Sequence, residues 1–184
     1  MHDLTTIHTP RLLLRRLQES DRPFILQMDT NKNVVGASRV RTTEQSDQFL
    51  AGQIDHWEKH GFGIWLAFDR DTLACAGRGG LRYEIIDGDR VVQVGYGLFP
   101  RFWGRGLATE IARASADAAF DVLGLTRLVA VALPNNIVSR KVLEKIGFSY
   151  ARDTQYDGTR HVLYERLKSP AAAAGISSLP DLLT

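Results

Sequence analysis

Several features that would indicate particular classes of protein are absent from this sequence. Among its 184 residues there is a single cysteine, Cys75, so no disulfide can form within the chain and no cysteine-cluster metal site can be built. Cys75 lies in an apolar, strand-like stretch, where we expect a buried and unreactive thiol. No group of His, Asp and Glu residues has the spacing of metal ligands, and the sequence suggests no Ser–His–Asp set.

Long hydrophobic runs and a strong charge of one sign are also missing. No apolar run approaches the ~20 residues of a membrane-spanning helix, and the N-terminus has no signal-peptide core. The 23 basic and 21 acidic residues leave a net charge of +2, and no nucleic-acid recognition motif is present. The net charge does not say how the charges are distributed, so it does not exclude a local basic patch. We therefore expect one cytoplasmic domain with neither a membrane nor a nucleic acid as partner.

The hydrophobic pattern predicts an α+β fold. Apolar or alternating runs predict strands at 11–17, 62–68, 72–86, 91–99, 126–133, 148–156 and 160–167. Helical spacing predicts a short helix at 23–28, a helix with a capping box at Thr43 that Gly61 stops, a helix from Leu107 to Gly124, and another that Gly147 closes. This order implies one mixed, mostly antiparallel sheet with helices on both faces.

The C-terminal end differs in composition from the rest of the chain. We assign residues 1–168 to the domain and 169–184 to a tail that is low in complexity and has little to pack, so a mobile tail is expected. Docking on a partner subunit through Leu179, Leu182 and Leu183 is the alternative, which leaves a homodimer open.

Two glycines, Gly104 and Gly106, stand between a predicted strand and the helix that begins at Leu107. A helix start leaves backbone N–H groups unpaired at the positive end of the helix dipole, and glycines let a ligand approach them, so the site suits a pyrophosphate. Arg101 and Arg105 are near enough to add charge. An ordinary tight turn with two solvated arginines explains the same spacing, and spacing alone leaves both interpretations open.

Two other phosphate-binding loops do not fit. The Rossmann fingerprint needs a third glycine where Thr109 stands, and the Walker loop needs a GKS or GKT tripeptide that this chain lacks. The glycines at 77–80 and 95–97 lie within predicted strands, where a bulge or close packing is the usual explanation.

Four motifs together resemble one known family. R-x-x-G-x-G-L-A at 101–108 resembles the acetyl-CoA loop of the GNAT superfamily of N-acetyltransferases. TPRLLLRRLQESD (9–21), VGYGLFPRFWGRGLATE (94–110) and PNNIVSRKVLEKIGF (134–148) resemble, in the same order, motifs of the branch that includes ribosomal-protein alanine N-acetyltransferases. The resemblance covers residues 5–168.

The resemblance implies the GNAT acyl-CoA N-acyltransferase fold and acetyl-CoA as acyl donor, with no metal. In that fold the fourth and fifth strands, here 91–99 and 126–133, splay apart around the acyl-CoA. Backbone groups of the fourth strand would bind pantetheine, the loop amides with the two arginines would bind pyrophosphate, and Asn136 would bind the pantetheine arm. The implied cofactor-binding residues are Leu98, Phe99, Arg101, Trp103, Gly104, Arg105, Gly106, Leu107, Ala108, Asn136 and Ser139.

Catalysis in such an enzyme needs positioning, an oxyanion donor and the handling of two protons. A strand amide near Gly97 or Leu98 is the expected oxyanion donor. The family's usual tyrosine acid is replaced by Leu143; in the branch that this chain resembles, the serine of N-x-x-S can lie near the sulfur instead, which implies Ser139 as the candidate acid, with simple packing in its helix as the alternative. The usual strand glutamate is replaced by Gln93, which cannot act as a base.

The remaining candidates each have an ordinary structural explanation as well. Glu84 is the candidate base, or else a solvated carboxylate at a strand end. Tyr96 either orders a catalytic water or packs in the cleft. His56 and Trp57 end the helix that borders the acceptor site in this family, so they line that pocket or lie in the core or on the surface. His161, on a final strand, is expected to be structural.

The sequence thus predicts an N-acetyltransferase that moves an acetyl group from acetyl-CoA to a primary amine, a protein N-terminus or a small molecule, by direct attack in a ternary complex. A non-catalytic CoA-binding regulatory module is the alternative, because two usual catalytic side chains are missing. The acceptor is not predicted.

Overall fold

The computed structural model describes residues 3–35 and 40–169, and its strands form one eight-stranded sheet in the order β1-β2-β3-β4-β5-β6-β8-β7. Every neighbouring pair is antiparallel except β5 and β6, which run parallel. The predicted mixed, mostly antiparallel sheet is confirmed. The strands are β1 (Thr6–His8), β2 (Leu12–Arg16), β3 (Ile64–Asp69), β4 (Cys75–Ile86), β5 (Asp89–Leu98), β6 (Arg127–Ala132), β7 (Ser149–Tyr156) and β8 (Thr159–Leu167). The three-residue β1 was not predicted.

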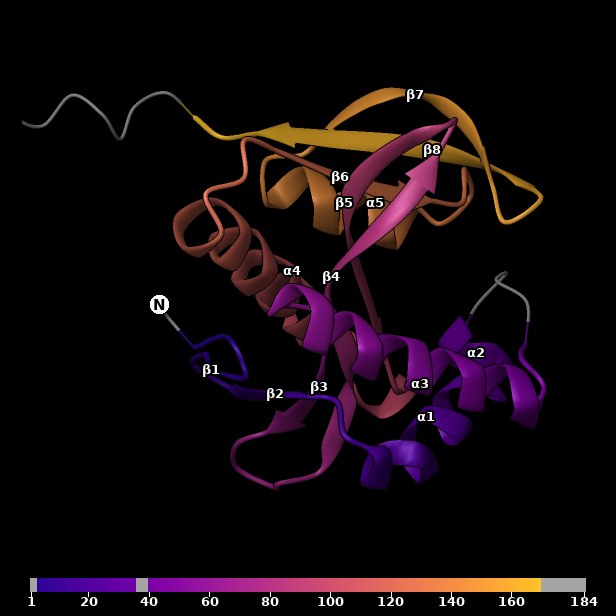
Figure 1. Cartoon of the computed structure of the whole chain (residues 1–184), viewed down its shortest axis with the longest axis vertical. Helices are drawn as coiled ribbons and strands as arrows, with labels where there is room; N and C mark the ends of the chain where they lie inside the picture. Colours follow the sequence, from indigo (N-terminus) through magenta and orange to yellow (C-terminus); the bar gives the residue numbers. More distant parts are fainter. Residues whose placement is uncertain (1–2, 36–39, 170–184) are drawn as a thin grey trace, which may run out of the picture.

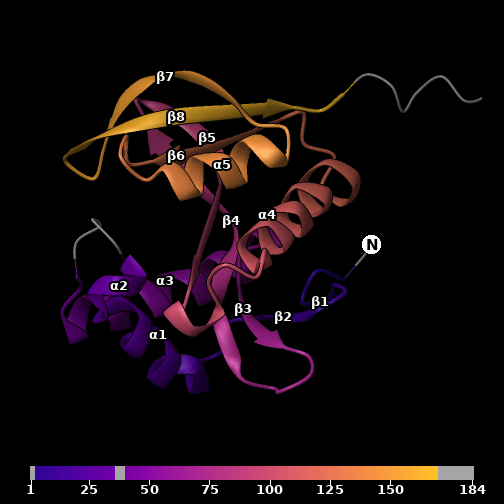
Figure 2. The same cartoon turned by 180° about the vertical axis from the view of Figure 1, so that it is seen from behind.

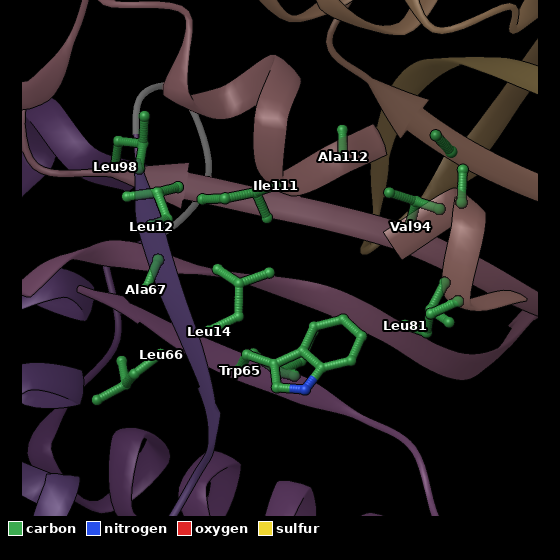
Figure 3. Close-up of a cluster of buried hydrophobic side chains, with 14 of the residues drawn as sticks. Leu12, Leu14, Trp65, Leu66, Ala67, Leu81, Val94, Leu98, Ile111 and Ala112 are labelled. Atoms are coloured by element: carbon green, nitrogen blue, oxygen red, sulfur yellow. The ribbon is translucent and has the colours of Figure 1, made fainter. Parts of the chain in front are cut away.

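Helices cover both faces of the sheet, as expected. They are α1 (Arg22–Asp29), α2 (Lys32–Val35), α3 (Thr43–His60), α4 (Leu107–Asp117) and α5 (Ile137–Lys145). Figure 3 shows the strands between α4 on one side and the helices of the N-terminal part on the other. In Figures 1 and 2, β1–β3 with α1–α3 form one half of the molecule and β6–β8 with α5 the other, while the long strands β4 and β5 connect the two.

The helix ends lie close to the capping residues predicted from the sequence, except at the start of α3 and at the end of α4. The N-cap of α3 is Thr42 rather than Thr43: its Oγ1 accepts the N–H of Gln45, whose side chain accepts the N–H of Thr42 in return. Gly61 ends α3 with φ of +70°, as predicted. Beyond α4 the chain continues as a π-helical turn (Ala118–Val122), which leaves Val122 38% exposed instead of on the predicted apolar face.

The core joins the sheet to α4. Leu14, Trp65, Leu81 and Ile111 come from β2, β3, β4 and α4, and all are fully buried in the cluster that Figure 3 displays. Close packing explains the strand glycines: a Cβ placed on Gly77 would lie 2.2 Å from the Gly97 carbonyl oxygen.

Two further observations concern the chain as a whole. No helix among the residues described here is long and apolar enough to cross a membrane. The predicted tail lies outside the described residues from position 170 onward.

Candidate active site

The sheet opens where its two parallel strands meet. Strands β4 and β5 pair along their length, from Gly77 opposite Leu98 to Ile86 opposite Asp89. By contrast, β5 and β6 share a single register pair, Gln93 with Val129. Beyond that pair the two strands separate, so the second half of β5 has one edge that no strand covers. The predicted splay is therefore present.

A cavity of about 500 Å³ occupies this opening. It is lined by the second half of β5, by β6, by the first turn of α5 and by the β7–β8 hairpin, and on its other side by β4 and the helices α1–α3. The site thus lies between the two halves of the molecule visible in Figure 1.

The uncovered edge of β5 presents backbone donors to this cavity. The N–H of Phe99 donates to the Ala76 oxygen (2.9 Å), on the β4 side. Because amides alternate between the two edges of a strand, those of Leu98 and Tyr96 face the opening. The carbonyl of Phe99 accepts the N–H of Phe102, so both backbone groups of Phe99 are used inside the protein. The Phe99 amide is therefore not available to pantetheine, whereas the Leu98 amide faces the opening, and the binding roles predicted for both residues stay predictions.

The glycine loop has the backbone that a ligand cradle requires. Gly104 and Gly106 have φ of +73° and +74°, a region that favours glycine. Gly106 is the N-cap of α4, and no side chain among the described residues caps that terminus. The side chain of Leu107 is fully buried, so only its amide faces outward, while Ala108 follows in the first turn. The amides that start α4 are therefore uncapped donors at the positive end of its dipole.

The two arginines of the loop already have partners within the protein. Arg101 donates to the Cys75 carbonyl oxygen (3.2 Å), and Arg105 donates to Asp69 Oδ2 (3.0 Å). The indole N–H of Trp103 donates to the Leu98 oxygen (2.8 Å). All three side chains thus connect the loop to neighbouring backbone or to Asp69. Cys75 itself is buried, which raises the pKa of its thiol to about 11 and confirms the unreactive state expected for it.

Two hydroxyl groups meet across the opening. The Tyr96 hydroxyl, from β5, lies 3.1 Å from Ser139 Oγ in α5. Burial raises the pKa of Tyr96 to about 12. Asn136 caps α5 by accepting the Ser139 N–H on its Oδ1 (3.1 Å), which leaves its Nδ2 donors facing the cavity that it lines. Tyr96, Asn136 and Ser139, predicted separately, are thus brought together.

The predicted base and acceptor-site residues lie elsewhere. Glu84 is not among the cavity-lining residues, and its carboxylate forms an ion pair with Arg82 (2.5 Å). Trp57 is a core residue that is 2% exposed and donates its indole N–H to the Ile64 oxygen. His56 Nε2 accepts the N–H of Tyr83 in an aromatic cluster outside the cavity. The structure therefore places all three side chains away from the cavity lining: Glu84 pairs within β4, Trp57 joins α3 to β3, and His56 joins α3 to β4.

Arg41, Arg78 and His161 are among the cavity-lining residues that were not predicted as site residues. The Nδ1 of His161 lies 3.1 Å from the Thr159 carbonyl oxygen and 3.3 Å from the Thr159 hydroxyl oxygen. Arg41 and Arg78 share one carboxylate, that of Asp29. Nothing in their local sequence signals this, because residues 29, 41 and 78 meet only through the tertiary fold.

Comparisons with known proteins agree with this geometry. Residues 11–149 match the sequence profile described as an acetyltransferase (GNAT) domain. The chain is 31% identical to the probable N-acetyltransferase YjcK of Bacillus subtilis, over 72% of this chain and 71% of that protein. A crystal structure of an acetyltransferase from Agrobacterium tumefaciens superposes with a TM-score of 0.78 at 25% identity, over 91% and 97% of the two chains. A spermidine N-acetyltransferase from Vibrio cholerae, in complex with CoA and spermine, shares the fold (TM-score 0.70, 18% identity, 86% and 96% covered).

Proposed function

The chain belongs to the GNAT acetyltransferase family and is an acyl-CoA-dependent N-acetyltransferase, and we propose that it transfers the acetyl group directly to a primary amine bound in the cavity between β5 and β6. The observation that carries this proposal is the single register pair between those strands. It leaves the edge of β5 uncovered at the point where a glycine loop starts α4. One ligand with amides at one end and a pyrophosphate at the other matches both features.

The residues at the opening fit acetyl-CoA, which would supply the acetyl group as a reactive thioester. The amides of Tyr96 and Leu98 face the open edge and suit the pantetheine amides and the thioester oxygen. The uncapped amides at the start of α4 suit the pyrophosphate. Asn136 lines the cavity and uses its Oδ1 to cap α5, so its Nδ2 can donate to the pantetheine arm. The CoA bound to the Vibrio cholerae protein of the same fold supports this assignment.

The Tyr96–Ser139 pair is the acid that we propose for the departing sulfur. As the amine nitrogen bonds to the carbonyl carbon and the carbon–sulfur bond breaks, a hydroxyl proton must pass to the thiolate. A phenol with a pKa of about 12 stays protonated at neutral pH, so it is available to donate its proton as the carbon–sulfur bond breaks. Ser139 Oγ, 3.1 Å from the phenol, orients or relays the proton.

His161 is the proton acceptor that we propose for the attacking amine. It lines the cavity, and its Nδ1 lies 3.1 Å from the Thr159 carbonyl oxygen, which holds the ring in place. A neutral imidazole can take the proton of the ammonium, directly or through water. It would supply the base that Gln93 cannot, since the Gln93 side chain accepts a hydrogen bond from Arg82 (3.1 Å).

A panel of primary amines tests the function. The panel should contain peptide N-termini, as the resemblance to ribosomal-protein acetyltransferases suggests, together with amino acids, aminoglycosides and polyamines. We expect acetylated product, identified by its mass, and release of free CoA above a reaction without acceptor. If no amine in a broad panel is acetylated while acetyl-CoA binds, the transferase assignment fails and the CoA-binding regulatory role gains support.

Substitution of Ser139 tests the proposed acid. Ser139→Ala should lower kcat while the dissociation constant of acetyl-CoA changes little. The matched control is Ser115→Ala, which removes the hydroxyl of a buried serine in α4 that donates to the Ile111 oxygen. An unchanged kcat for Ser139→Ala would remove Ser139 from the mechanism.

A further inference from the structure

A buried ion cluster borders the cavity on the side of the N-terminal helices. Asp29, at the end of α1, is fully buried. Its Oδ1 accepts hydrogen bonds from Arg78 Nη2 (2.5 Å) and Arg41 Nη1 (3.0 Å). Both arginines line the cavity, whereas Asp29 does not. The two guanidinium groups therefore stand between the carboxylate and the open space.

This cluster is not neutral. Two guanidinium groups share one carboxylate, which leaves one positive charge in excess. The ring of Phe49 lies 4.5 Å and 4.4 Å from the two guanidinium carbons, and cation–π contacts stabilise the cations without neutralising them. Among the described residues, the buried Nη1 of Arg78 has no hydrogen-bond partner. This Nη1 is buried from the cavity, as is the unpartnered Asp29 Oδ2, so an anion in the cavity can reach only the exposed parts of Arg41 and Arg78, whose side chains are 34% and 16% exposed.

The rest of the cavity does not offer an equivalent site. The third arginine of the lining, Arg82, is paired with Glu84 (2.5 Å) and also donates to the Tyr156 hydroxyl (2.8 Å). Asp157, the acidic residue of the described lining, is exposed at the tip of the β7–β8 hairpin. The uncompensated positive charge is thus concentrated at Arg41 and Arg78.

We propose that the acceptor is an amine that also carries a carboxylate, and that Arg41 and Arg78 bind this carboxylate while the amine faces the Tyr96–Ser139 pair. The inference rests on the proposed function and adds the class of its substrate. A planar guanidinium pairs well with a carboxylate, and one excess charge matches a monoanion.

The cluster and the hydroxyl pair line the same cavity from opposite faces of the sheet. Gly79 lies opposite Tyr96 in the β4–β5 ladder, and Arg78 precedes Gly79, so the side chains of Arg78 and Tyr96 point to opposite faces. An acceptor that binds at both places must therefore extend through the cavity, as an amino acid or the first residues of an acidic peptide can. A polyamine would meet a positive charge here, so the preference of the spermidine N-acetyltransferase that shares this fold is not expected for this protein.

Matched acceptors give the first test. Steady-state rates with acetyl-CoA are compared for free amino acids and their primary amides, for dipeptides with an acidic or a neutral second residue, for phosphoethanolamine and for spermidine. We expect kcat/KM to be about tenfold to a hundredfold higher for each carboxylate than for its neutral partner, as for a charge-assisted hydrogen bond. Comparing the rates for free amino acids with those for dipeptides shows whether the carboxylate belongs to a free amino acid or to a peptide. Equal rates for carboxylate and amide, or a preference for spermidine or phosphoethanolamine, would overturn the inference while leaving the proposed function intact.

A substitution gives the second test. Arg41→Gln removes the excess charge but leaves Arg78 and Asp29 as a neutral pair, so the fold should survive. It should abolish most of the preference for the carboxylate. The control is Arg22→Gln, which removes an exposed arginine that is also paired with an aspartate, Asp47, outside the cavity. A preference that is unchanged in Arg41→Gln would argue against the site.

A binding measurement separates the inference from turnover. Calorimetric titration of the CoA-bound protein with the best amino acid and with its amide should give a dissociation constant about tenfold lower for the carboxylate. If no amine is acetylated, the proposed function fails, yet this titration still decides the inference: equal affinities overturn it.

Discussion

The two edges of β5 differ in how they are hydrogen-bonded: one is paired along its length, and the other is mostly unpaired. On one edge β5 pairs with β4 from Asp89 to Leu98, and glycines let the strands and their neighbours approach closely. On the other edge it pairs with β6 at Gln93 only, and the remaining backbone faces a cavity of about 500 Å³. The closed edge provides the rigidity, and the open edge provides the unpaired donors that a ligand can use.

A pair of glycines that lie opposite each other should show the largest difference between the edges. A Cβ on Gly80 of β4 would lie 2.3 Å from the Gly63 oxygen, whereas a Cβ on its partner Gly95 would meet nothing within 4 Å. We expect Gly80→Ala to lower the free energy of unfolding by about 3 kcal/mol, from overpacking and backbone strain. Chemical denaturation measures this loss.

Gly95→Ala is the matched control for that substitution. It should change the free energy of unfolding by no more than about 0.5 kcal/mol, because its methyl group points into open space. It should instead lower turnover, since Gly95 lines the cavity. Equal destabilisation by the two substitutions would contradict the distinction between the edges.

The hydroxyl pair that spans the open edge should show the next largest effect, on catalysis rather than stability. Tyr96→Phe removes the hydrogen bond to Ser139 and the proposed acid, so kcat should fall by roughly a hundredfold, the lower range for general acid catalysis. Because the pKa of Tyr96 is raised to about 12, wild-type kcat should not decline with ionisation of this phenol below about pH 10. A pH–rate profile of both proteins checks this, and an unchanged kcat for Tyr96→Phe would exclude the phenol as the acid.

The closed part of the molecule could be predicted from sequence far better than the open part. Strand periodicity and the glycine stops of the helices are local signals, and they correctly predicted the order of the longer elements and the place of the glycine loop, although the short β1 and α2 were missed. The site predictions that depended on family position alone were less accurate: Glu84 and His56 turned out to pair within the fold. The Asp29–Arg41–Arg78 cluster was missed because it joins three distant elements, and no local pattern records which arginine will share a carboxylate.

A third prediction separates ligand binding from backbone strain in the glycine loop. Gly104→Ala places a side chain at φ of +73°, which should cost about 1–2 kcal/mol of stability. It should also weaken acetyl-CoA binding about tenfold, equivalent to 1.4 kcal/mol, because the loop backbone can no longer approach the pyrophosphate in the same way. Isothermal titration with acetyl-CoA measures the affinity.

Gly124→Ala is the control for the loop. Gly124 has nearly the same φ, +67°, and the same open surroundings, but lies beyond the other end of α4. It should lose similar stability without a change in acetyl-CoA affinity. If both substitutions weaken binding equally, the loop is a turn like any other and not a cradle.

The smallest expected effect concerns His56, on the side of β4 that faces away from the opening. Burial lowers the pKa of His56 below its usual 6.5, and its Nε2 accepts the Tyr83 N–H only while that nitrogen is unprotonated. The unfolded state therefore binds the proton first as pH falls. The contribution of His56 to the free energy of unfolding is complete above about pH 6.5, and it is lost as pH falls from there toward the lower pKa of the folded state.

Chemical denaturation of wild type and His56→Gln between pH 5 and pH 8 tests this. The slopes of the free energy of unfolding against pH should differ between the two proteins by no more than the value for about one proton. Identical slopes would show that His56 does not couple the packing of α3 on β4 to pH, and that the closed edge owes its stability to strand pairing and close packing alone.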